Sequence, residues 1–197
     1  MATAVLEGIG RRLWGFPPNL MGDIVDQLGP LGSLTWFVRN MPKYEKTLRK
    51  FGPLRTHLLA LTISLVNGCP YCSYGHALAF ELAYFKTFDS PFPLNEDQLV
   101  ALGGLDPTTI GQRIGDALDE AGIDTERAWV IRTLELCAGD GASTPDDDRV
   151  AHLVAMFGVL NTCGIAGSTP RDQAHDPLNK DGQLKERYLA ARGAAST

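Results

Sequence analysis

Two cysteines and a histidine stand at spacings that could support thiol chemistry. They are Cys69, Cys72 and His76, in the run Cys-Pro-Tyr-Cys-Ser-Tyr-Gly-His. If a helix begins at this run, its unpaired N–H groups and positive dipole end stabilise a thiolate and lower the pKa of the thiol. The i, i+3 spacing brings the second sulfur within reach of the first, so a disulfide can close after either is oxidised. His76 follows Cys72 by one helical turn, where a neutral imidazole can accept the thiol proton directly or through one water.

The flanking sequence predicts a helical hairpin that holds this run. Four leucines recur at helical spacing and would form one buried stripe: Leu54, Leu58, Leu61 and Leu65. Asn67-Gly68 is typical of a helix end, and a second apolar segment extends over residues 69–86. In an antiparallel hairpin, position 57 lies roughly opposite positions 76–80. His57 is therefore expected to face the interior near His76.

Further helices are predicted along the rest of the chain, near residues 20–28, 33–50, 95–103, 107–121, 124–138 and 144–161. Breaks are expected at Gly29-Pro30, Met41-Pro42 and Gly52-Pro53. Alternating apolar and polar patterns typical of strands are scarce. The chain is therefore predicted to be all-α, one domain of six to nine helices over residues 1–197. Residues 1–20 are expected to form an irregular arm, and residues 168–197 a loosely held polar tail.

The composition excludes several classes of function. The chain has 197 residues and a net charge of −5, and its basic residues are scattered, so nucleic acid is not expected as a partner. No Gly-rich phosphate loop is present, and no cofactor is expected. Residues 56–80 contain no Asp, Glu, Lys or Arg, but a bend at Asn67-Gly68 would leave backbone groups unsatisfied in lipid, so no membrane span is predicted. The first residues do not resemble an export signal, and a cytoplasmic location, where thiols stay reduced, is expected.

The run from Leu54 to His76 resembles the carboxymuconolactone decarboxylase and alkyl hydroperoxidase D (AhpD) superfamily. The signature of that family is a glutamate, eleven residues, Cys-x-x-Cys, three residues and a histidine. The resemblance is close over residues 53–80 and faint beyond them, where only residues 149–161 are similar to a later helix of the family. It implies an all-α, AhpD-like homo-oligomer. It also implies an antioxidant oxidoreductase that reduces hydroperoxides and is regenerated by an external dithiol or disulfide reductase.

The resemblance also implies roles for individual residues. Cys72 would attack the peroxide, Cys69 would resolve the sulfenic acid into a disulfide, and His76 would relay the proton. His57 occupies the position of the family glutamate. An imidazole does not replace a carboxylate in kind, because it can become charged and repel a protonated His76. This substitution puts the efficiency of the relay, and with it ordinary peroxidase turnover, in question.

Other interpretations remain open from the sequence. His57, Cys69, Cys72 and His76 supply two nitrogens and two sulfurs, a set that zinc accepts, so the protein could instead be a metal- or ligand-binding module. Cys-Pro-Tyr-Cys also occurs in glutaredoxins, where a strand precedes the pair. A third alternative is a non-redox lyase acting on a carboxylated lactone, as in superfamily members without the pair.

Several residues near or beyond the cysteine pair receive a modest role or none. Tyr71 is a minor candidate for a hydrogen bond to substrate or sulfur. Cys137 and Cys163 are predicted to be inert, buried as small apolar residues, and His152 and His175 have no evident partner.

Overall fold

The computed structural model describes residues 1–195, and this part of the chain contains helices and no strand. The all-α prediction is therefore confirmed, and the strand that a glutaredoxin-like fold requires before Cys69 is absent from the described residues. The helices are α1 (Ala2–Trp14), α2 (Leu20–Val66), α3 (Pro70–Phe88), α4 (Glu96–Val100), α5 (Pro107–Glu120), α6 (Arg127–Cys137), α7 (Pro145–Ala166) and α8 (Gly182–Ala195), with 3-10 turns η1 (Asp124–Glu126) and η2 (Pro177–Lys180).

Helix α2 consists of three helical pieces joined at two glycines. Gly29 and Gly52 have φ angles of 72° and 79°, and each is followed by a proline that cannot donate to the preceding turn. The sequence predicted breaks at both places. It also predicted a break at Met41-Pro42, which is wrong, because the helix continues through Pro42 without non-helical backbone.

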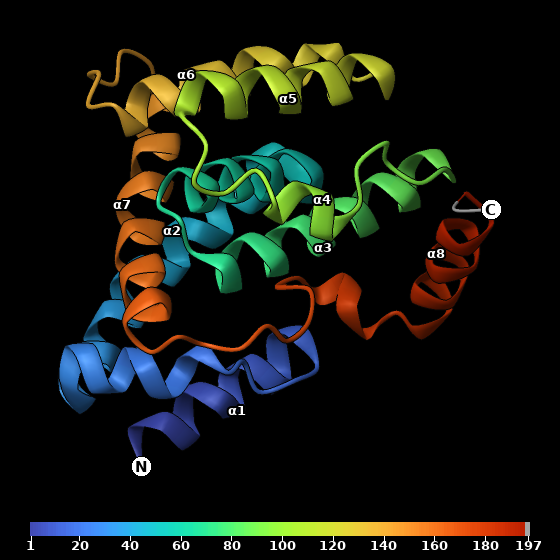
Figure 1. Ribbon diagram of the computed structural model, residues 1–197. Coiled ribbons are helices and arrows are strands. Elements are labelled where there is room, and N and C mark those ends of the chain that lie inside the picture. The colour runs from blue at the N-terminus through green and yellow to red at the C-terminus, as the bar shows by residue number, and fades with distance from the viewer. Residues whose placement is uncertain (196–197) are drawn as a thin grey trace.

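The last piece of α2 and helix α3 form the predicted antiparallel hairpin, which lies at the centre of the fold (Figure 1). Residues 56–65 are buried on every side, so the leucine stripe is only one of two packed faces. One face packs under α5 and α6, which lie above the hairpin in Figure 1, in a cluster that includes Leu58, Leu61, Phe80, Ile114 and Val130. The other face packs against α7 in a cluster that includes Leu59, Ile63, Leu153 and Phe157.

Both chain ends are more ordered than the sequence predicted. Residues 2–14 form α1 instead of an irregular arm. The chain after α7, orange to red in Figure 1, runs between the N-terminal helices and α3 before it forms η2 and α8. The prediction of a loose tail is wrong for residues 168–195, because Leu184 and Tyr188 pack against α3 and Arg192 pairs with the buried Glu81. Residues 196–197 of that predicted tail lie outside the described residues.

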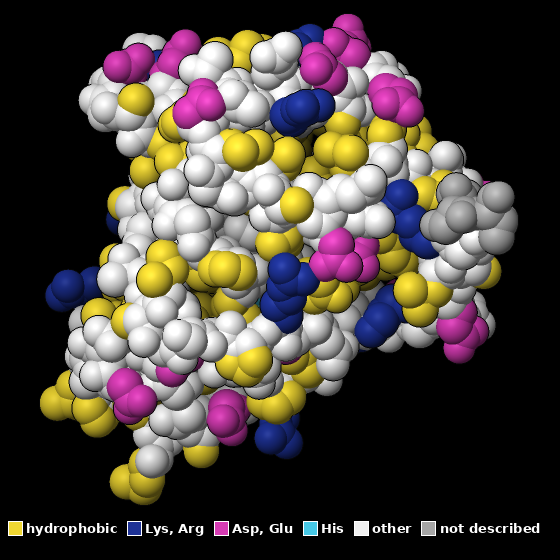
Figure 2. Space-filling view, in the orientation of Figure 1, with side chains coloured by type: hydrophobic (Ala, Val, Ile, Leu, Met, Phe, Trp, Pro, Cys, Tyr) yellow, Lys and Arg dark blue, Asp and Glu magenta, His cyan; other side chains and the backbone are white. Residues whose placement is uncertain are grey.

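Acidic and basic side chains are interspersed with hydrophobic ones on the face shown in Figure 2. Helix α7 is long and apolar enough to cross a membrane by length and composition alone. In this structure Val150, Leu153 and Phe157 place one side of α7 in the core that it shares with α2. The same helix therefore serves as a wall of the interior next to the cysteine pair.

Candidate functional site

The cysteine pair stands at the start of α3, as the sequence predicted. Cys69 is the N-cap residue with an extended backbone, and Pro70 occupies the first helical position. The Sγ atom of Cys69 accepts a hydrogen bond from the backbone N–H of Cys72 at 3.4 Å. Both cysteines are free thiols and are almost completely buried. The helix start therefore places one sulfur directly on the N–H groups that have no partner within the helix.

The acidic thiol of the pair is Cys69. A hydrogen bond from the Cys72 thiol, together with backbone N–H groups of Cys72 and Tyr71, lowers the pKa of Cys69 against the opposing effect of burial. The same hydrogen bond and burial raise the pKa of Cys72. The expectation that helix and imidazole would together acidify Cys72 is therefore wrong for the reduced pair. The N-cap position favours the thiolate one turn earlier in the chain.

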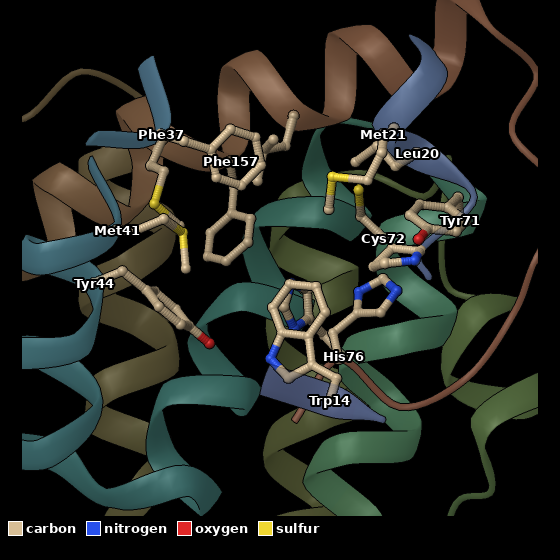
Figure 3. A pocket seen from close by; sticks show the side chains of 14 residues that line it. Trp14, Leu20, Met21, Phe37, Met41, Tyr44, Tyr71, Cys72, His76 and Phe157 are labelled. Carbon is tan, nitrogen blue, oxygen red and sulfur yellow. The ribbon is translucent and has the colours of Figure 1, made fainter. Parts of the chain in front are cut away.

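Cys72 and His76 line one cavity of about 50 Å³ beside α3 (Figure 3). This space is large enough for water, since about 10–15 Å³ of such volume is enough to hold one molecule. Most of its other walls are apolar and come from α1, α2 and α7: Trp14, Leu20, Met21, Phe37, Met41, Met156, Phe157 and Leu160. In the described part of the chain, no hydrogen bond joins the Cys72 sulfur to His76. The cavity is therefore where the thiol and imidazole could share a bound molecule.

His57 meets His76 as the hairpin geometry predicted. The two Nδ1 atoms lie 3.1 Å apart, and the ring centroids are separated by 5.4 Å with an angle of 29° between the rings. Burial, followed by the charges of His175 and His57, lowers the pKa of His76 well below its ordinary value. His76 is therefore neutral at neutral pH and has the protonation state that a general base requires.

A carboxylate that the sequence analysis did not identify completes this contact. Nε2 of His57 lies 2.8 Å from Oδ2 of Asp176, which is the N-cap residue of η2. The other oxygen, Oδ1, accepts a hydrogen bond from the N–H of Leu178 at 2.7 Å. Burial acts to raise the pKa of Asp176, but the hydrogen bonds from His57 and from the Leu178 N–H act to lower it, and the pKa lies below its ordinary value. Asp176 is therefore an anion at neutral pH.

A second acidic residue of the same segment holds Tyr71 and His175. The Tyr71 hydroxyl donates to Oδ2 of Asp172 at 2.7 Å, and Nε2 of His175 lies 3.1 Å from Oδ1. The His175 ring is 4.9 Å from that of Tyr71 and 5.4 Å from that of His76, between centroids. The prediction that His175 has no partner is wrong, because it contacts Asp172, and its ring also lies in the wall of the cavity. The hydroxyl of Tyr71 is engaged with Asp172, although its side chain also lines the cavity.

The only trace of these residues in the sequence is the spacing of Asp172, His175 and Asp176 within a polar segment. That pattern is common in exposed loops, and nothing local connects it to the cysteine pair. Asp176 lies 119 residues from His57 in the chain. The pattern can be interpreted only in the folded chain, where this segment brings Asp172 to Tyr71 and Asp176 to His57.

The other cysteines and histidine considered from the sequence lie outside the network of Cys72, His76, His57 and Asp176 or at its edge. Among residues 1–195, no group of three or more His, Cys, Asp and Glu side chains could hold a metal ion. His57 in particular directs both nitrogens at protein partners. Cys163 is buried in the same apolar cluster as the cysteine pair, whereas Cys137 lies in the partly buried layer near α6 and α7. The prediction that His152 has no partner is wrong, because its Nε2 lies 3.1 Å from Oδ1 of Asn40.

Comparisons with known proteins identified no relative of this chain. No protein-family model, no curated protein and no solved structure matches the chain.

Proposed function

We propose that this protein is a thiol-dependent peroxidase of the carboxymuconolactone decarboxylase and AhpD type. The observation that carries the proposal is the shared cavity, which Cys72 and the neutral His76 line together. A sulfur that can form a disulfide with its neighbour and a base for its proton are the two groups that such a reaction requires. The motif spacing and the all-helical hairpin that holds it give further support.

The reaction begins with Cys72, the cysteine that lines the cavity. His76 accepts the Cys72 proton, and the thiolate attacks the outer oxygen of a hydroperoxide ROOH. The O–O bond breaks, Cys72 becomes a sulfenic acid, and the alkoxide takes the proton from His76 and leaves as ROH. The Cys69 sulfur then attacks the Cys72 sulfur, and the hydroxyl group leaves as water with the Cys69 proton. The lowered pKa of Cys69 suits it to this second attack.

An external dithiol donor completes the cycle by reducing the disulfide, because the reaction consumes two electrons from the cysteine pair. A dithiol or a disulfide reductase would serve, and the proposed setting is a cytoplasmic homo-oligomer. Substrate entry requires the cavity to widen. The chain's three internal methionines, Met21, Met41 and Met156, line it and can change rotamer more readily than branched side chains.

The cavity walls favour an uncharged hydroperoxide over a carboxylated lactone. No Lys or Arg occurs among the lining residues found in the described chain. A carboxylate would therefore lose its hydration without a cationic partner, which is costly in an apolar space. This observation separates the proposal from the lyase alternative.

The proposal is tested by following consumption of an alkyl hydroperoxide with dithiothreitol as donor. Cys72→Ser is expected to reduce the rate to the background without protein. Cys69→Ser should complete one attack and accumulate a sulfenic acid on Cys72 that a dimedone probe labels. Cys137→Ser, outside the cavity, is the matched control and should retain the wild-type rate. Equal rates for wild type and Cys72→Ser would overturn the proposal.

A further inference from the structure

We propose that Asp176 is a positioning residue that acts through His57 to fix the tautomer of His76. In this arrangement the free base nitrogen of His76 is Nε2, and its Nδ1 carries the proton. The consequence for turnover rests on the proposed peroxidase function. The tautomer itself does not, and it can be measured without any substrate.

The inference begins at the carboxylate. Asp176 is an anion, so it can only accept a hydrogen bond, and the atom facing its Oδ2 at 2.8 Å is Nε2 of His57. His57 must therefore carry a proton on Nε2. In the neutral ring this leaves Nδ1 of His57 as an acceptor.

The second step transfers this constraint to His76. Nδ1 of His57 and Nδ1 of His76 lie 3.1 Å apart, and two acceptors at that distance would repel. His76 must therefore donate from Nδ1, which leaves the lone pair on Nε2. Because His76 lines the cavity and its Nδ1 is already engaged, Nε2 is the nitrogen available to the Cys72 proton.

The same contacts determine where the positive charge goes when His76 takes that proton. His76 gains the proton on Nε2 and can pass its Nδ1 proton to His57, which becomes an imidazolium next to the Asp176 carboxylate. The sequence predicted that a charged His57 would repel a charged His76. The structure instead allows one charge to be shared by the two rings and neutralised by Asp176, so the repulsion does not arise.

The surroundings hold Asp176 in this position. Its backbone starts η2, and its Oδ1 accepts the hydrogen bond that caps this turn. The carboxylate is therefore fixed with Oδ2 directed at His57. The titratable groups that face this network are Tyr44 from α2, Lys86 from α3 and His175 from the same segment. Burial and the charge of Asp176 raise the pKa of Tyr44, which therefore stays neutral. His57 is completely buried, so no water competes for the shared proton.

The experiment that tests the tautomer is ¹⁵N NMR of the histidine rings in the reduced protein. In the wild type, His76 should show a protonated Nδ1 and an unprotonated Nε2. Asp176→Asn keeps the shape and an oxygen for the Leu178 N–H, but it directs an NH₂ donor at His57. Both rings should then reverse, and the His76 proton should move to Nε2. Asp181→Asn, which alters a helix-capping carboxylate that bonds Leu184 in the same segment, is the matched control and should leave His76 unchanged.

An Nε2 proton on His76 in the wild type, or unchanged tautomers in Asp176→Asn, would overturn the inference. Folding of each variant is checked in the same spectra, so a disordered segment is distinguished from a reversed tautomer. Because this measurement involves no peroxide, its outcome is independent of the proposed function.

A kinetic experiment tests the consequence for the proposed reaction. Asp176→Asn should reduce the rate of Cys72 oxidation by about 10²–10⁴-fold, the range for losing a general base. In the His57→Glu background, a carboxylate would accept directly from Nδ1 of His76, so adding Asp176→Asn should then cost less than tenfold. An equally large loss in both backgrounds would show that Asp176 acts only on folding and would overturn its positioning role.

Discussion

The hydroxyl of Tyr71 donates a hydrogen bond to Asp172 at 2.7 Å and joins the cysteine turn to a segment 101 residues further along the chain. The same carboxylate accepts from the backbone N–H of Asn19 and contacts His175. Asp172 therefore ties the start of α3 to both the N-terminal and the C-terminal parts of the fold. Four residues downstream, Asp176 reaches His57.

Tyr71→Phe is expected to lower the free energy of unfolding by about 1.5–3 kcal/mol, the range for losing a hydrogen bond to a charged group. The substitution leaves the buried Asp172 carboxylate with one hydrogen-bond donor fewer. Equilibrium denaturation measures the resulting change in the free energy of unfolding. Tyr74→Phe is the matched control, because the ring of Tyr74 lies against Arg171 and would remain there. An effect of Tyr74→Phe as large as that of Tyr71→Phe would contradict the prediction.

The hydrogen bond between the two thiols predicts how the pKa of Cys69 depends on Cys72. Since the Cys72 thiol is the largest cause of the lowered pKa of Cys69, Cys72→Ala should raise that pKa toward or above its ordinary value. The titration can be followed by the ¹³C shift of the Cys69 Cβ. Cys137→Ala should leave it unchanged, because Cys137 belongs to a different cluster. A Cys69 titration that is the same in Cys72→Ala and wild type would refute the coupling.

Glu81 predicts a pH dependence of stability. Burial raises its pKa from 4.5 to about 8, although Arg192 and Tyr188 act to lower it. Between these two values the folded chain holds a proton that the unfolded chain has lost. The contribution of Glu81 to stability is therefore full below about pH 4.5 and is lost as the pH rises through about 8, by on the order of 5 kcal/mol.

The measurement is denaturant unfolding of wild type and Glu81→Gln at several pH values in that interval. The stability difference between the two proteins should change in favour of Glu81→Gln as the pH rises. Glu186→Gln, on the exposed side of α8, should follow the wild type at every pH. A constant difference between wild type and Glu81→Gln would disprove the raised pKa.

Two helix glycines are expected to respond to alanine with opposite signs. A Cβ at Gly75 would overlap the ring of His175, whose backbone N–H also donates to the Gly75 carbonyl at 3.2 Å. Gly75→Ala should therefore destabilise the protein by about 1–3 kcal/mol and displace the segment that carries Asp172 and Asp176. At Gly158 in α7 a Cβ would meet nothing within 4 Å, and Gly158→Ala should stabilise by about 0.5–1 kcal/mol. Thermal unfolding of both variants checks the pair, and a change of the same sign in both would contradict it.

The sequence by itself determined the hairpin and the location of its chemistry. A charge-free apolar stretch with leucines at helical spacing, interrupted by Asn67-Gly68, favours two packed helices, and Pro70 after Cys69 sets the start of the second. Helical periodicity then places position 57 near position 76. These features are local, because they depend on propensities and spacings within about 30 residues.

Only the tertiary structure decided which sulfur is acidic and what orients His76. The acidity of Cys69 depends on the direction of a thiol and two N–H groups, which spacing alone does not specify. Asp172 and Asp176 lie in a polar segment that resembles a loose tail, because its apolar anchors are few and its partners are polar groups more than 90 residues away. Hydrogen bonds between distant residues leave no periodic signal in a sequence. The carboxylate behind His57 therefore became visible only when the chain was folded.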